Sequence, residues 1–155
     1  MFDYNTLIAL EKDVRKIGEM VGQEFDVFSF DTTKEEWCVK KARVVKSGSL
    51  VKMVKLMFDE GEGLVCTEET EFLMRNEDKF EYKENKEVVE GIVPWKRNAT
   101  NMTCKGGFRK YDHKIVSREE AEGREGYRLE VEETNNYVVL IKNTDELKRG
   151  IIVKN

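Results

Sequence analysis

The C-terminal stretch 127–155 decides the fold. It reads Tyr-Arg-Leu-Glu-Val-Glu-Glu-Thr-Asn-Asn-Tyr-Val-Val-Leu over 127–140 and Gly-Ile-Ile-Val-Lys-Asn over 150–155. Apolar and charged residues alternate from Tyr127 to Glu132, and this period of two is typical of a half-buried strand. The polar run 134–136 predicts a turn into a second strand over 137–141, and a third apolar run covers 151–153. The sequence therefore predicts three short strands near this end of the chain.

The rest of the chain has the same character, with many strand signals and few helix signals. Apolar runs recur over 6–10, 14–17, 25–31, 37–45, 50–58, 64–67, 72–75, 79–82, 92–95 and 112–117. The clearest turn signal is 59–63, because its glycines accept the positive φ of tight hairpins. Turns are also expected at 47–49 and 118–126. A short helix is expected over 83–90, capped by Gly91, and one helical turn over 17–21. Many short strands at near-regular spacing predict an all-β domain.

The composition indicates one soluble globular domain. Of the 155 residues, 39% are hydrophobic and 37% are charged, and a chain of this length buries a core without disulfides or a structural metal. The net charge of −4 gives no overall attraction to nucleic acid or to an anionic membrane. We therefore expect a single domain over 1–155 that acts as a monomer.

The sequence contains neither a targeting segment nor the pattern of a metal site. No apolar run approaches the roughly 18 residues of a membrane span, and charged residues interrupt the N-terminal region. Cys38, Cys66 and Cys104 are odd in number and widely spaced, and His113 is the single histidine. We therefore expect no disulfide framework, metal or cofactor. Without an export signal or membrane span, the expected location is the cytoplasm.

The C-terminal stretch resembles the closing motifs of inteins and related Hint domains. In that family a strand reading roughly Val-Tyr-Asp-Leu-Glu-Val-Glu-Asp-Thr-His-Asn-Phe is followed by Gly-Ile-Val-Val-His-Asn at the last residue. The matching positions are Tyr127, Leu129, Glu130, Val131, Glu132, Thr134, Asn136, Tyr137, Gly150 and Asn155. The resemblance implies a horseshoe-shaped Hint fold with pseudo-twofold halves, in which the two chain ends meet at a central cleft.

The resemblance to a mini-intein extends over nearly the whole chain. The segments 5–10 and 14–19 look like the family's first motif, which begins with a nucleophilic Cys or Ser at the position of Met1. The segment 59–73 looks like the second motif, a Thr-x-x-His-x-Phe signature. Thr67 and Phe72 fit that signature, and Thr70 replaces its histidine. Residues 96–111 lie where larger inteins carry a homing endonuclease, and we expect a loop there.

The resemblance also implies which positions would carry the chemistry. In the family, the first residue attacks the preceding carbonyl with help from the second-motif Thr and His and a third-motif Asp. The terminal Asn then cyclises with help from two further histidines. Carried over to this chain, the Asp becomes Arg128, the third-motif His becomes Asn135 and the penultimate His becomes Lys154. Only Thr67 and Asn155 keep the family's residue.

These substitutions remove the groups that attack carbonyls and move protons. A methionine thioether has no proton to lose, so Met1 cannot begin an acyl shift. Threonine and asparagine cannot exchange protons near neutral pH as an imidazole does, and a protonated lysine is a poor base. Each positioned acid or base contributes about 10²–10⁴ in rate. We therefore expect a splicing-inactive domain, with the flanking host segments, the exteins, as its partners if it is an insert.

Two alternatives stay open. In a longer precursor, Asn155 could cyclise and cleave the bond that follows it, with Lys154 polarising the scissile carbonyl. The substitutions could also have been introduced into an active parent sequence. A relocated thiol nucleophile is not expected, because Cys66 directly precedes Thr67 and the third motif contains no cysteine. Cys38 is expected to pack in the core.

The stretch 94–114 is the basis of a separate hypothesis. Its basic residues are Lys96, Arg97, Lys105, Arg109, Lys110 and Lys114, its single acid is Asp112, and Trp95, Phe108 and Tyr111 lie among them. Basic and aromatic side chains together suit single-stranded nucleic acid or an acidic partner. Because the whole chain is acidic, we expect a solvated loop here and keep binding as the alternative.

Overall fold

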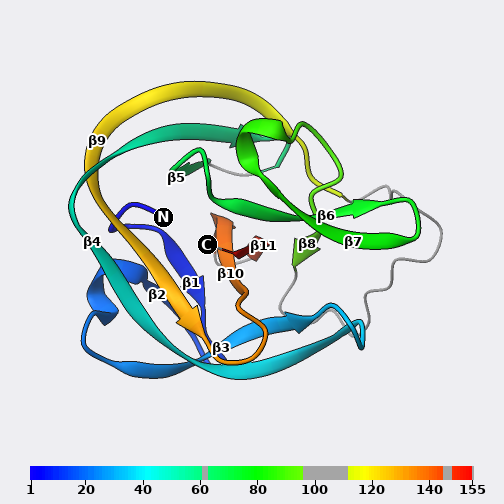
Figure 1. The fold of residues 1–155 in the computed structure, drawn as a ribbon, viewed down its shortest axis with the longest axis horizontal. Helices are drawn as coiled ribbons and strands as arrows, with labels where there is room; N and C mark the ends of the chain where they lie inside the picture. Colours follow the sequence, from blue (N-terminus) through cyan, green and yellow to red (C-terminus); the bar gives the residue numbers. More distant parts are fainter. Residues whose placement is uncertain (61–62, 96–111, 145–147, 155) are drawn as a thin grey trace.

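The computed structural model describes residues 1–60, 63–95, 112–144 and 148–154, which are mainly antiparallel strands (Figure 1). The strands are β1 (Leu7–Ala9), β2 (Val14–Lys16), β3 (Glu24–Asp31), β4 (Glu36–Phe58), β5 (Leu64–Cys66), β6 (Glu71–Asn76), β7 (Lys79–Glu84), β8 (Pro94–Trp95), β9 (Ile115–Val131), β10 (Tyr137–Asn143) and β11 (Lys148–Lys154). Two short 3-10 helices, η1 (Ile17–Met20) and η2 (Asn85–Glu87), complete the elements. The all-β prediction is confirmed.

Within the described ranges the strands form two sheets. The larger has the order β2-β1-β10-β11-β6-β7, with β8 also paired to β11. The smaller has the order β3-β4-β5, with β9 paired to β4. The strands predicted at 137–141 and 151–153 become β10 and β11, which lie side by side in the larger sheet. In the same part of the chain, no helix has the length and apolar character that a membrane crossing requires.

Strands β4 and β9 form a long curved ribbon around the molecule (Figure 1). The turns predicted at 47–49 and 118–126 are wrong, because both segments continue their strands. The pairing register shifts between Lys46 and Leu50, and such bulges bend a strand without ending it. Gly48, with a φ of +74°, supplies the unusual backbone angle at this bend.

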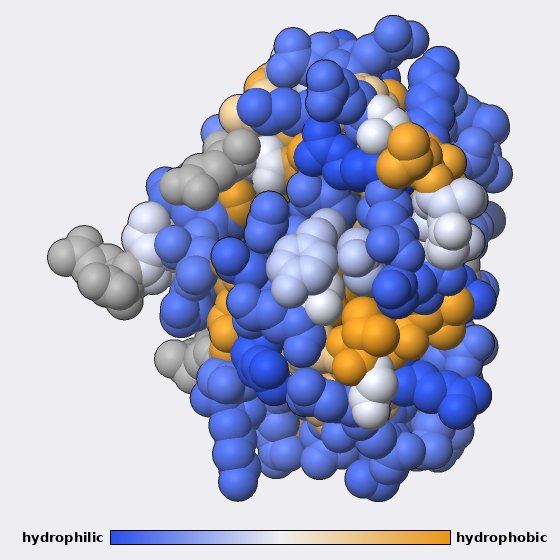
Figure 2. All heavy atoms as spheres, turned by 90° about the vertical axis from the view of Figure 1, so that its left-hand side faces the viewer, coloured by the Kyte–Doolittle hydropathy of each residue, from blue (hydrophilic) through white to orange (hydrophobic). Residues whose placement is uncertain are grey.

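The charges of 118–126 belong to the solvated face of this ribbon. Lys52 on β4 lies 3.5 Å from Glu120 on β9, and Lys46 lies 3.5 Å from Glu125. The side of the molecule along which the ribbon curves is mostly hydrophilic, with some apolar areas between (Figure 2). The run of charged residues that suggested a turn therefore reflects cross-strand charge pairing.

The helix predicted over 83–90 is also wrong. Strand β7 continues to Glu84, and only η2 follows it. Asn85 is completely buried, and its backbone N–H and side-chain amide donate hydrogen bonds to carbonyls of the segment 67–70. These tertiary contacts override the helix propensity of the surrounding residues.

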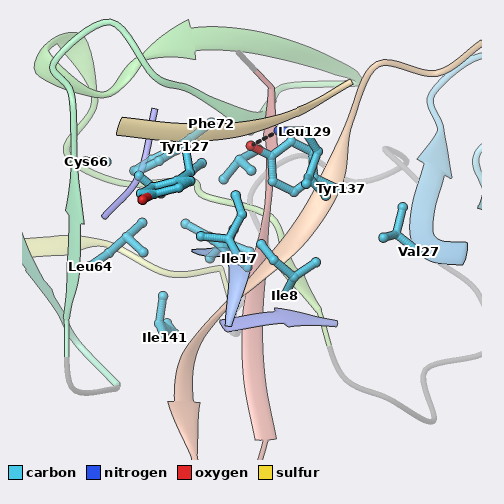
Figure 3. Packing of buried hydrophobic residues seen from close by; sticks show 14 of the residues in the cluster. Ile8, Ile17, Val27, Leu64, Cys66, Phe72, Tyr127, Leu129, Tyr137 and Ile141 are labelled. Carbon is cyan, nitrogen blue, oxygen red and sulfur yellow. Dashed lines mark hydrogen bonds between the residues drawn. The ribbon is translucent and has the colours of Figure 1, made fainter. Parts of the chain in front are cut away.

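The core fills both faces of the larger sheet. Val139, Ile141 and their neighbours face one apolar cluster, and Val138 and Leu140 face a second. This explains why 137–141 is a continuous apolar run rather than an alternating one. In the first cluster, the Tyr137 hydroxyl accepts a hydrogen bond from the Leu129 backbone N–H at 3.3 Å (Figure 3).

The two ends of the chain reach the centre of the molecule (Figure 1). Phe2 pairs with Tyr127 of β9 through backbone hydrogen bonds of 2.7 and 2.8 Å. Near the other end, Lys154 pairs with Glu71 at the start of β6. Because Thr70 precedes Glu71 and contacts Met1, Met1 and Lys154 both lie next to the segment 67–71.

Candidate functional site

The main chain of Met1 lies in a cradle made by the turn 67–70, which connects β5 to β6. The Met1 amino nitrogen donates to Thr67 Oγ1 at 2.9 Å and to Thr70 Oγ1 at 2.7 Å. The Met1 carbonyl accepts from the Thr67 backbone N–H at 2.9 Å and from the Thr70 hydroxyl at 3.3 Å. The structure thus brings together the three residues that match the reactive positions of the first two motifs.

Arg128 shares a hollow with this cradle. The hollow has a volume of about 490 Å³ and is lined by Met1, Val51, Lys52, Thr67, Glu69, Thr70 and Arg128. Arg128 lies on β9, one residue after the Tyr127 that pairs with Phe2. The register of that pairing therefore brings Arg128 to the same opening as Met1.

Burial dominates the electrostatics of the cradle. It lowers the pKa of the Met1 amino group from 8.0 to about 6, although Cys66 and Glu69 oppose the shift; Arg128 lowers the pKa further. An amine in a desolvated pocket loses its proton more easily because the charged form is no longer solvated by water. Burial therefore favours the neutral form of this amine.

Cys66 is the thiol next to this site. It is completely buried, and burial raises the pKa of its thiol to about 12. Because the thiolate is the nucleophilic form of cysteine, a thiol with such a pKa is inert at neutral pH. Cys38, where we expected core packing, is half-buried on β4, and burial raises the pKa of its thiol as well.

The arrangement of the whole chain is similar to that of solved inteins. A DnaB intein from Synechocystis sp. is 19% identical, with a TM-score of 0.74 over 99% of this chain and 96% of the intein. An intein from a hyperthermophile is 13% identical, with a TM-score of 0.74 over 99% and 98% of the two chains. The chain has the Hint fold of inteins.

A bacterial intein-like domain from Clostridium thermocellum shares the Hint fold as well. It is 14% identical, with a TM-score of 0.66 over 99% of this chain and 97% of that domain. No protein-family model and no curated protein matches the sequence. The Hint fold is therefore established by the structure, together with the sequence motifs that predicted it.

Asn135 does not join Met1 in this Hint fold. Its side chain is exposed, its φ is +57°, and it lines a different hollow, together with Glu24, Lys41 and Arg43 among others. Asparagine tolerates the left-handed conformation better than most residues. Asn135 therefore fits the left-handed backbone of the connection between β9 and β10, and the predicted break between these two strands is confirmed.

The neighbouring Asn136 is buried and organises a polar network. Its Oδ1 accepts from the Phe30 backbone N–H at 2.8 Å and from the Ser29 hydroxyl at 2.6 Å. Its Nδ2 donates to the Phe30 carbonyl and to the Tyr82 hydroxyl, both at 2.7 Å. Lys154 reaches the same network, because its Nζ lies 4.9 Å from the centre of the Tyr82 ring.

Sequence reasoning missed Asn85, which contacts the cradle from beneath. The sequence around Asn85 does not indicate a buried polar role, because the hydrogen-bond partners of Asn85 lie far along the chain.

Within the described residues, no three His, Cys, Asp or Glu side chains converge to hold a metal ion.

Some of the predicted site residues lie outside the described residues, so their roles stay predictions. They are Asn155 and the basic residues Lys96, Arg97, Lys105, Arg109 and Lys110. Three members of the same stretch, Trp95, Asp112 and Lys114, lie in the described part of the chain, and Lys114 is exposed. Trp95 is 2% exposed and packs against Phe28 with ring centres 5.7 Å apart. Asp112 forms a buried ion pair with Arg75 at 3.2 Å. Because Trp95 is buried, its ring cannot stack on a nucleic-acid base.

Proposed function

We propose that this chain is an intein-like domain that has lost protein splicing and persists as a folded insert or as an interaction module. The observation that carries the proposal is the contact of Met1 with Thr67 and Thr70. The backbone arrangement of a splicing junction is present, while the side chain that would attack is a thioether. The exteins of a host protein are the partners of such an insert.

The proposed loss follows from what N-terminal cleavage requires. If residues precede Met1, its nitrogen is the peptide nitrogen of the bond to be broken, and that nitrogen must receive a proton as it leaves. The Thr70 hydroxyl is placed at this nitrogen, 2.7 Å away. A hydroxyl is far too weak an acid to replace an imidazolium at neutral pH, and the rate loss from such an exchange is about 10²–10⁴-fold.

Neither neighbour of Met1 replaces the missing groups. The Cys66 thiol is buried with a raised pKa, so it supplies no nucleophile. Arg128 carries a positive charge at the position where the family has an aspartate. A guanidinium stays protonated at all relevant pH values and cannot act as a base.

The test places the chain between two reporter domains fused directly to Met1 and Asn155. We expect a denaturing gel and intact mass spectrometry to show only the full-length precursor after long incubation, with or without added thiol. Ligated reporters or a cleaved fragment would overturn the proposal.

A second candidate is cleavage after Asn155 in a longer precursor. Lys154 favours it, because the face of the Tyr82 ring holds its ammonium at the end of β11, close to the junction. A cation there would polarise the scissile carbonyl. Mass spectrometry would then detect a fragment ending in a succinimide, and the Lys154→Ala precursor would cleave more slowly. A precursor that stays intact eliminates this candidate.

A further inference from the structure

Asn85 holds the carbonyl groups of the turn that contacts Met1. Its Nδ2 donates to the Thr67 carbonyl at 2.7 Å and to the Thr70 carbonyl at 3.0 Å. Its backbone N–H also donates to the Thr70 carbonyl at 3.0 Å. A primary amide carries two N–H donors, so both are used on the two ends of one turn.

Arg118 completes the hydrogen bonding of Asn85. From β9, its Nη1 donates to Asn85 Oδ1 at 2.8 Å, and its Nη2 donates to the Asn85 carbonyl oxygen. The guanidinium thereby determines which side of the Asn85 amide faces the turn, because only the nitrogen can donate to carbonyls. The strand that carries Arg118 continues to Arg128 at the hollow beside Met1.

We propose that Asn85 and Arg118 are positioning residues of the Met1 site. They hold the turn 67–70 so that the Thr67 and Thr70 hydroxyls both stay directed at the Met1 nitrogen. The proposal concerns the site on which the proposed function rests, and it adds a chain of contacts from β9 through η2 to Met1. Neither residue touches the bond that a splicing element would break.

The hydrogen bonding distinguishes this role from ordinary core filling. Burying an asparagine is costly unless its polar atoms are paired, and an apolar side chain of similar size would fill the space at least as well. The paired atoms of Asn85 are directed at the two carbonyls that set the orientation of the threonines. Asn85 and Arg118 thus fix the direction of the Thr67 and Thr70 hydroxyls, which packing alone would not determine.

The titration of the Met1 amino group reports on this geometry. Water entering a loosened cradle would relieve the burial that lowers the pKa of the amine to about 6, and the pKa would move back toward 8.0. The pKa of the amine is also affected by the charges of Cys66, Glu69 and Arg128. The variants used in the experiment leave these three residues unchanged. A residue that contributes only stability would leave the amine of the folded protein unchanged.

The experiment follows the Cα resonance of Met1 by NMR in methionine-labelled protein between pH 4 and 10. We expect the midpoint to rise by about one unit in Arg118→Lys, which keeps the charge but loses the two-point contact, and in Asn85→Leu. Arg149→Lys is the matched control, because Arg149 pairs with Glu60 and does not contact the turn.

An unchanged midpoint in folded Arg118→Lys would overturn the proposal, whether or not Asn85→Leu folds. An equal rise in Arg149→Lys would overturn it too, because the effect would then not be specific to the turn. The titration uses the chain without flanking reporters. Splicing by a precursor would therefore contradict the proposed function without changing the outcome of the Met1 titration.

Discussion

Thr70 Oγ1 lies 2.7 Å from the Met1 nitrogen, although 69 positions separate the two residues in the sequence. The Thr-x-x-His-x-Phe pattern places a histidine at this position, so the threonine occupies a place from which an imidazole would reach the same nitrogen. This contact supports the proposal that the substitution changes the chemistry at this position while the turn stays next to Met1.

The buried amino group of Met1 should make stability depend on pH. Its pKa falls from 8.0 in the unfolded chain to about 6 in the folded one. Between these values the unfolded state binds more protons, so the free energy of unfolding rises with pH. This contribution is complete above pH 8 and is lost as the pH falls through 6, and two units correspond to at most about 2.7 kcal/mol.

Urea denaturation at pH 5.5 and 8.5 measures this dependence. Acetylation of the amino terminus removes the titrating group, so the acetylated protein is the control and should lose the added slope. If the free energy of unfolding rises equally with pH in the free and acetylated proteins, groups other than the Met1 amine cause the pH dependence.

Cys66 should not react in the native state. Burial raises the pKa of its thiol to about 12, whereas Cys38 is half-buried. In a Cys104→Ser background, Ellman's reagent should modify Cys38 first and Cys66 only at the rate of unfolding. Modification of Cys66 as fast as Cys38, mapped by mass spectrometry, would show that a nucleophile is available beside Met1.

Asn136→Ala should be strongly destabilising. The substitution leaves the Phe30 backbone groups and the Tyr82 hydroxyl without their partner, and we expect a loss of about 3 kcal/mol in the free energy of unfolding. Asn135→Gly is the matched control, since the exposed neighbour has a φ of +57° that glycine adopts freely. The control should stay within about 0.5 kcal/mol of the parent in urea denaturation. Equal losses would refute the buried role of Asn136.

Much of the fold could be predicted because its signals are local. The alternation from Tyr127 to Glu132, the polar run at 134–136 and the apolar run of β10 are each visible in neighbouring residues. The contact of Met1 with Thr67 and Thr70 was predictable only through the resemblance, because no local pattern reports a contact across 69 positions.

The wrong predictions share a physical cause. At Gly48 a bulge bends β4 where the sequence suggests a turn, and the acids of 118–126 face lysines on β4 rather than solvent alone. At Asn85, tertiary hydrogen bonds prevent a helix that local propensity favours. In each case the decisive partner lies far along the chain.

The central claim is that the site keeps the geometry of a splicing junction and lacks its chemistry, and restoring the chemistry tests it most directly. Met1→Cys, Thr70→His and Arg128→Asp are combined in a precursor with reporter domains on both sides, and thiol-dependent release of the N-terminal reporter is followed on a denaturing gel. We predict release from the triple variant at least about 10²-fold faster than from Met1→Cys alone. Equal rates in the two precursors would contradict the account, because the cradle would then not be in place to use the restored groups.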